Sequence, residues 1–276
     1  MFEMFQHSFM VQALIVALIT GLLLSYLGVH VVSRGIVFVD LALGQISMLG
    51  VATAQYLEFG LTVIPIIFTL AGAILLSLIN IKDKRFKREA VIGIVYAFAS
   101  ALTVLIIANT PHGDADIQEV LFGNILAVSW DQIALVGTIF GLLMMLHVVF
   151  YKKFIQLTAY LSDEQNNTAG KLNLWNFLFF ISIGLAIVFA VKINGVILVF
   201  SYLIIPPVCG MILSRTMVGV IIIAVLVSIF GSFLGLQFSF HLDYPAGSSI
   251  VALLGVVFVL VNIVPLIKWI KNLIHN

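Results

Sequence analysis

The chain has 276 residues, of which 62% are hydrophobic and only 9% are charged, and its formal net charge is +1. A soluble domain has about one quarter of its residues charged, so this composition excludes a soluble protein. The small net charge indicates neither a nucleic acid nor an acidic partner. A single cysteine, Cys209, excludes an internal disulfide and a thiolate cluster.

Long apolar runs predict an all-α, polytopic membrane helix bundle. Lipid cannot satisfy backbone polar groups, so spanning segments are helices or closed barrels, and these runs are continuous rather than alternating as barrel strands are. Each span needs roughly 20 residues, which leaves room for about eight to nine transmembrane helices. We therefore expect residues 1–276 to form a single transmembrane domain with no soluble catalytic domain.

The apolar runs between charged or turn-rich breaks predict the helices in order. Five are predicted in the first half, near 10–32, 36–56, 62–81, 90–109 and 132–151. Four more are predicted near 174–191, 196–213, 217–237 and 248–268. Asn194-Gly195 and Pro206-Pro207 interrupt an apolar run, and proline lacks an amide donor. This segment is therefore expected to be bent or only partly spanning, which leaves eight full spans as the alternative to nine.

The loop Lys82–Arg88 predicts the orientation, because it contains five of the thirteen Lys and Arg residues. Cytoplasmic loops carry an excess of Lys and Arg, so this loop is placed inside the cell. Counting spans from it puts the other loop cations inside, with Lys192 as the exception. The acids that it puts outside are Glu3, Glu58, Asp114, Asp116, Glu119 and Asp243. The prediction is a multi-pass protein of the inner or plasma membrane, with its N-terminus outside and its C-terminus in the cytoplasm.

Two hydrophilic segments are long enough to contain structure of their own. Outside, Pro111–Gln132 is either a short helix that forms a docking surface or gate, or a solvated loop in which Asp131 caps the next helix. Inside, Phe154–Asn173 begins amphipathic and becomes polar before Gly170, which predicts a short surface helix followed by a C-cap. That helix either receives force from a soluble motor or rests on lipid.

Four strings of the sequence, in their order and spacing, carry a resemblance to one family. They are DLALGQISMLGVA (Asp40–Ala52), VLFGNILAVSWDQI (Val120–Ile133), VKINGVILVFSYLIIPP (ending at Pro207) and HLDYPAGSSIV (His241–Val251). The chain resembles the permease subunits of ATP-binding-cassette (ABC) importers for zinc, manganese or iron. The resemblance implies about eight helices per subunit and a cytoplasmic coupling helix near Leu157–Gly170. The residues that it assigns to coupling with the ATPase are Leu157, Thr158, Ala159, Tyr160, Leu161, Ser162 and Gly170.

The resemblance also implies a set of partners. Two copies would form a homodimer in the lipid membrane, bind a cytoplasmic ABC ATPase and receive the metal ion from an extracellular or periplasmic binding protein. The sequence has no Gly-rich phosphate-binding loop with its lysine. We therefore expect a transport subunit that is not an enzyme and binds no cofactor, while the partner subunit uses ATP to drive inward movement of the ion by alternating access.

The second predicted helix departs from the family pattern at two positions. Where the family carries an aspartate and, four residues later, a histidine, this chain has Leu41 and Gln45. An i, i+4 pair lies on one helical face, where a single cation can meet both ligands. Asp40 and Gln45 lie about 140° apart around a helix, so they do not rebuild that pair. The amide oxygen of Gln45 would favour a harder ion, a hydrated one, or passage without tight coordination.

Four polar residues are the candidates for the metal pathway, namely Asp40, Gln45, His241 and Asp243. A carboxylate within a span is a functional candidate by default. Asp40, however, lies close to the cytoplasmic interface, where a favourable charge at a helix N-terminus or a pair with Arg34 explains it equally well.

The candidates at the external end also have two interpretations. His241 and Asp243, beside Pro245, offer an imidazole and a carboxylate as ligands, or they form an ordinary turn and helix cap. His30 and His147, near the cytoplasmic ends of their spans, are expected to be satisfied interface histidines.

Three alternatives to a metal importer remain open at this point. They are an ion-coupled secondary carrier or channel, an ABC importer for a non-metal substrate, and a membrane scaffold. A carrier would place several buried ionisable residues along a proton or sodium route, and the predicted spans contain almost none. A neighbouring gene for an ATPase would favour the importer.

Overall fold

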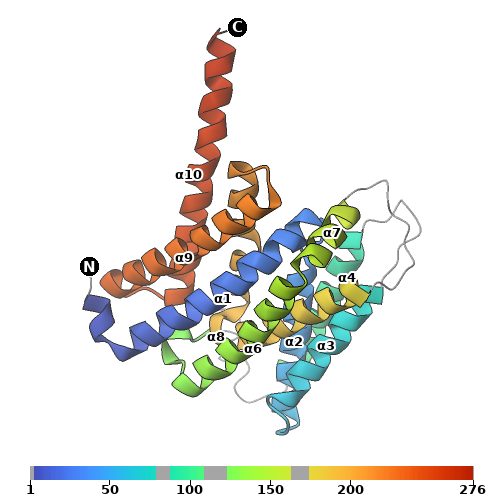
Figure 1. The fold of residues 1–276 in the computed structure, drawn as a ribbon. Helices are drawn as coiled ribbons and strands as arrows, with labels where there is room; N and C mark the ends of the chain where they lie inside the picture. Colours follow the sequence, from blue (N-terminus) through green and yellow to red (C-terminus); the bar gives the residue numbers. More distant parts are fainter. Residues whose placement is uncertain (1–2, 79–87, 109–122, 163–173, 276) are drawn as a thin grey trace.

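The computed structural model describes residues 3–78, 88–108, 123–162 and 174–275. Throughout these ranges the regular structure is helical, which confirms the predicted all-α class (Figure 1). The first half comprises η1 (Glu3–Gln6), α1 (Ser8–Ser33), α2 (Val39–Tyr56), α3 (Val63–Leu78) and α4 (Arg88–Ile107). The second half comprises η2 (Ile125–Ala127), α6 (Trp130–Val149), α7 (Tyr151–Ser162), α8 (Leu174–Leu213), α9 (Met217–Leu242) and α10 (Ala246–His275).

Six of the described helices are long and apolar enough to cross a membrane. They are α1, α4, α6, α8, α9 and α10 as far as Ile263. Helix α3 is apolar but has only 16 residues, and the 18 residues of α2 include Asp40 and Gln45. The polytopic membrane fold is confirmed, whereas the number of crossings stays a prediction.

Helix α1 is the centre of the bundle. In its apolar stretch 72% of the residues are buried, against 22% to 28% in α4, α6, α9 and α10. Helix α1 packs against α6, α8 and α9 along its length, and the C-terminal end of α1 packs against α7. The outer helices leave many large apolar side chains exposed. Because lipid tails are as apolar as these side chains, the exposed faces suit a membrane.

Gly195 divides α8 into two helices. Its backbone has φ 75° and ψ 161°, a conformation that is open essentially only to glycine, and this is the break predicted at Asn194-Gly195. Before the break, the guanidinium carbon of Arg34 lies 3.7 Å from the ring centroid of Phe179, and Asn194 Nδ2 donates to Thr20 Oγ1 at 3.1 Å. The first half of α8 therefore runs antiparallel to α1.

The second half of α8 turns back toward the C-terminal end of α1. Tyr202 packs against Gly21, and Pro207 packs against Gly28. Residue numbers therefore increase in the same direction along both helices, so the second half of α8 runs parallel to α1. The helix continues through Pro206-Pro207. The bend expected in this segment thus lies at Gly195 rather than at the prolines.

Gly28 permits an unusually close approach between α1 and α8. Pro207 has no amide hydrogen to donate to the carbonyl of Leu203, four residues earlier. That carbonyl lies against the backbone of Gly28, where any added Cβ would overlap its oxygen. A side chain at position 28 would therefore force the two helices apart.

Helix α7 lies where the sequence predicted an amphipathic cytoplasmic segment, but it begins earlier. It starts at Tyr151, separated from α6 only by Phe150, rather than near Leu157. The buried positions Phe154, Leu157 and Thr158 follow an i, i+3, i+4 pattern, which extends one helical face back to the end of α6. Residues 163–173, with the predicted C-cap at Gly170, lie outside the described residues.

The segment between α4 and α6 is described from Gly123 onward. It contains the single turn η2, while most of the predicted external helix falls within residues 109–122, outside the described residues. Ser129 Oγ accepts from the Gln132 amide at 3.3 Å, and Gln132 Oε1 accepts from the Ser129 amide at 2.9 Å. This capping box makes Ser129 the N-cap of α6, in place of the predicted Asp131, which lies in the first turn.

Candidate functional site

Asp40 is a buried carboxylate at the start of α2. Only 3% of the residue is exposed, and within the described part of the chain neither carboxylate oxygen has a hydrogen-bond partner. The oxygens lie beside the amides of Asp40 and Leu41 without reaching hydrogen-bond geometry. The predicted pair with Arg34 is therefore not formed as a hydrogen bond, whereas the position suits a favourable charge at a helix N-terminus.

Gln45 is also buried in α2, with 7% of the residue exposed. A Cβ added to its neighbour Gly44 would lie 3.7 Å from the Val196 side chain of α8. This part of α2 therefore lies against the segment that follows the break in α8. The structure does not bring His241 or Asp243 to Asp40. Among the described residues, no group of three His, Cys, Asp or Glu side chains could hold a metal ion.

His241 and Asp243 are exposed at the end of α9. Asp243 is the C-cap, in the left-handed conformation with φ 55° and ψ 40°, as is common where helices end. The turn is closed by the Tyr244 amide donating to the Ser239 carbonyl at 3.2 Å, and by Ser239 Oγ donating to the Tyr244 carbonyl at 2.6 Å. The cap interpretation thus accounts for Asp243, and a metal role for the two side chains stays a prediction.

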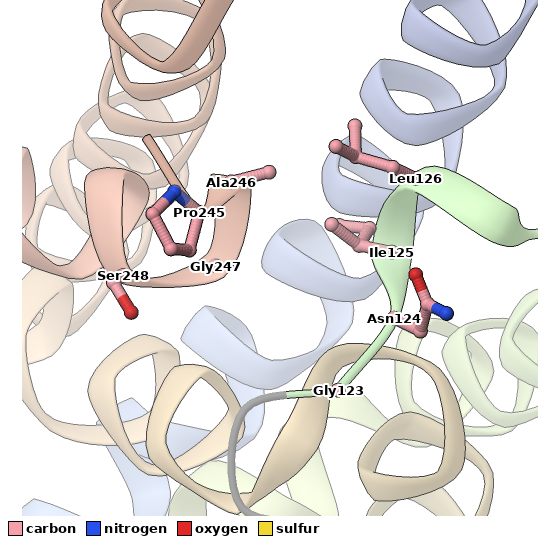
Figure 2. A pocket seen from close by; sticks show the side chains of 8 residues that line it. All are labelled: Gly123, Asn124, Ile125, Leu126, Pro245, Ala246, Gly247 and Ser248. Carbon is pink, nitrogen blue, oxygen red and sulfur yellow. The ribbon is translucent and has the colours of Figure 1, made fainter. Parts of the chain in front are cut away.

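A cavity of about 150 Å³ lies next to this turn. Its walls are Gly123–Leu126 on one side and Pro245–Ser248 at the start of α10 on the other (Figure 2). The Asn124 amide donates to the Ile193 carbonyl at 3.1 Å, which holds this wall against the break in α8. The cavity therefore lies where the α9–α10 turn, η2 and Gly195 meet.

At the opposite end of α1, a buried polar junction joins α1 to α7. His30 Nδ1 and Thr158 Oγ1 form a hydrogen bond of 2.8 Å, and Arg34 Nε donates to the same oxygen at 3.0 Å. His30 is 0% exposed and Thr158 only 3%. Because His30 and Arg34 are four residues apart, they lie on one face of α1 and hold a single hydroxyl group.

Aromatic rings surround this junction. The His147 ring of α6 stacks on Phe154 of α7, with centroids 4.1 Å apart and planes 18° apart, and His147 Nδ1 donates to the Leu143 carbonyl at 3.0 Å. Phe179 of α8 lies against both His147 and Phe154. These rings exclude water from the junction, and hydrogen bonds shielded from water are costly to lose.

The residues predicted for ATPase coupling divide between two faces of α7. Leu157 and Thr158 are buried against the bundle, Leu161 is half-buried and Ala159 is exposed. Tyr160 and Ser162 belong to the helix, although the structure does not describe their side chains, and Gly170 lies outside the described residues. The sequence interpretation missed the partners of Thr158. Their one local signal was the i, i+4 spacing of His30 and Arg34.

Long apolar helices define the described chain as a multi-pass membrane protein, and polar side chains such as Asp40 and Gln45 are buried between its helices. Polar groups buried within a membrane bundle are typical of the transport class. The sequence profile of the ABC 3 transport family matches residues 6–265, and the chain belongs to this family. The resemblance inferred from the sequence is confirmed, and the chain is a transport subunit rather than an enzyme.

Relatives of known name match nearly the whole chain. The "Manganese transport system membrane protein MntC" of Halalkalibacterium halodurans is 24% identical over 258 residues, which cover 94% of this chain and 88% of that protein. The "Probable iron transport system membrane protein" of Haemophilus influenzae is 28% identical, with 93% and 90% covered. The solved structure "PsaBC from Streptococcus pneumoniae in complex with Fab" has a TM-score of 0.77 and 25% identity, with 93% and 91% covered.

Proposed function

We propose that this chain is the permease of an importer that moves a divalent metal ion into the cell by alternating access. A separate cytoplasmic ATPase supplies the energy, an external binding protein delivers the ion, and two copies of the chain form the pathway. The observation that carries the proposal is the match, over almost the full length, to membrane proteins named for manganese and iron transport. The shared helical fold supports it.

Helix α7 is the proposed contact with the ATPase. One face packs on the bundle through Phe154, Leu157 and Thr158, while Lys152 and Lys153 are exposed on the other. An amphipathic helix held in this way presents a polar face to a soluble partner. In the proposed orientation that face points to the cytoplasm, with the N-terminus of the chain outside and the C-terminus inside.

A second copy of the chain is the proposed partner within the membrane. Helices α9 and α10 leave large apolar side chains exposed, among them Phe230, Leu234 and Val259, and α10 projects from the bundle (Figure 1). Both lipid and a second copy would cover such a surface, and the homodimer is the proposed occupant of part of it. Asp40 and Gln45 would meet the ion on its route, and His241 and Asp243 would meet it at the external end.

Manganese is the ion we favour among zinc, manganese and iron. Carboxylate and carbonyl oxygens suit manganese, whereas imidazole suits zinc. On α2 this chain offers the Asp40 carboxylate and the Gln45 amide, and it has Gln45 where a histidine is expected. Named manganese transport proteins among the relatives support the same choice.

The proposal is tested by copurifying the chain with its candidate ATPase and reconstituting the complex in lipid nanodiscs. ATPase activity is then measured with the binding protein empty or loaded with zinc, manganese or iron. Stimulation by the manganese-loaded form is expected. Failure to bind an ATPase would overturn the importer and favour an ion-coupled carrier, while binding without stimulation by any metal would point to a non-metal substrate.

A further inference from the structure

The hydroxyl group of Thr158 is the polar contact through which α7 meets α1. His30 Nδ1 and Thr158 Oγ1 share a hydrogen bond, and Arg34 Nε donates to the same oxygen, so two side chains at the C-terminal end of α1 meet one hydroxyl group of α7. Phe154, one turn earlier on α7, packs instead against His147, Trp175 and Phe179 of α6 and α8. The two contacts thus lead from α7 into different helices.

Helix α1 continues from this junction to a second rigid contact. Gly28, just before His30, lies against the carbonyl of Leu203 and the ring of Pro207 in the second half of α8. There is no flexible side chain in this contact that could absorb a movement of α1. A displacement of α1 at His30 would therefore be passed directly to the part of α8 that follows Gly195.

We propose that Thr158 is a positioning residue that couples α7 to α1, so that movement of α7 is transmitted through His30 and Arg34 to the second half of α8. This inference rests on the proposed function, in which the ATPase moves α7. It assigns transmission to the buried face of α7 and contact with the ATPase to the exposed face. Breaking the junction should uncouple ATP hydrolysis from transport without preventing assembly.

The variant Thr158→Val tests the inference, because it keeps the shape of the side chain and removes the hydroxyl. Reconstituted complexes with the ATPase and loaded binding protein are compared by the number of manganese ions transported per ATP hydrolysed. Loss of two buried hydrogen bonds is expected to lower this ratio about tenfold, while Thr158→Ser, which keeps the hydroxyl, restores it. A purely structural defect would lower the amount of complex and both activities together, leaving the ratio unchanged.

Thr103→Val is the matched control. Thr103 is equally buried, but its hydroxyl donates to Ala99 of its own helix at 2.8 Å, so the ratio should stay at the wild-type value. His30→Phe cuts the junction from the side of α1 while keeping an aromatic ring between Tyr26 and Phe179. If Thr158→Val does not accumulate, the ratio of manganese ions transported to ATP hydrolysed is measured in His30→Phe instead. The double variant should have a ratio no lower than that of either single variant.

An unchanged ratio in both Thr158→Val and His30→Phe would overturn the inference. The wild-type complex separates this failure from a failure of the proposed function. If the wild type shows no ATP-dependent metal transport, the importer proposal itself is wrong. If it transports metal and the two variants do so with the same ratio, only the role of the junction is refuted.

Discussion

Replacing Gly28 with alanine should destabilise the bundle by about 2 kcal/mol. The new methyl group would overlap the Leu203 carbonyl oxygen and lie 2.8 Å from Pro207 Cγ, and neither the backbone nor the proline ring can easily move aside. Overpacking costs about 1–3 kcal/mol, with this site near the upper end. The higher helix propensity of alanine offsets roughly 0.5–1 kcal/mol of that cost.

The single cysteine of the chain provides the assay for this prediction. Cys209 is buried in the same half of α8, so a thiol-reactive fluorescent dye reports its exposure as the purified protein is heated. At about 2–4 °C per kcal/mol, Gly28→Ala should unfold about 4–8 °C below the wild type. Gly141→Ala is the control, because an added Cβ there meets nothing within 4 Å. If Gly28→Ala unfolded at or above the wild-type temperature, the close packing of α1 and α8 would be refuted.

Further predictions concern the proposed ion route and the core. Asp40→Asn removes a buried carboxyl group that has no hydrogen-bond partner in the described chain. The unfolding temperature should change little, because relief of an unpaired buried charge offsets loss of a charge at the helix N-terminus, while manganese uptake drops at least about tenfold. Normal uptake would leave Asp40 only its role at the helix N-terminus. Installing Leu41→Asp with Gln45→His should shift uptake toward zinc over manganese by about tenfold, measured in competition, and an unchanged ratio would place these positions off the route. Tyr202→Phe removes the hydrogen bond to Ser232 and should lower the free energy of unfolding by about 1 kcal/mol, measured by the Cys209 assay. A gain in stability would show that this hydrogen bond does not stabilise the bundle.

Apolar runs and a single glycine were sufficient to predict most helices. The span expected near 10–32 is α1 at Ser8–Ser33, and the break expected at Asn194-Gly195 is present. The end of α9 was placed too early, at 237 rather than Leu242, because a helix tolerates the polar residues that follow Gln237. Its end is set by the left-handed backbone of Asp243, which a local pattern indicates only weakly.

The junction at Thr158 could not be predicted from local sequence. His30 and Thr158 are separated by 128 positions, and their contact exists only because α6 and α7 pack in succession along α1, which places α7 beside its C-terminal end. For the same reason His30 and His147 were expected at the interface but are fully buried. Burial depends on which helices pack together, and periodicity along one helix does not contain that information.

The central position of α1 has a consequence for biogenesis. This helix is made early and is apolar on all sides, so it is stable in lipid on its own after it leaves the ribosome. Its packing partners α8 and α9 extend to Leu242, and at about 5–20 residues per second they are completed roughly 10–40 s later. During that interval lipid must occupy the surface of α1 that the later helices cover, so expulsion of lipid is a necessary step in assembling this bundle.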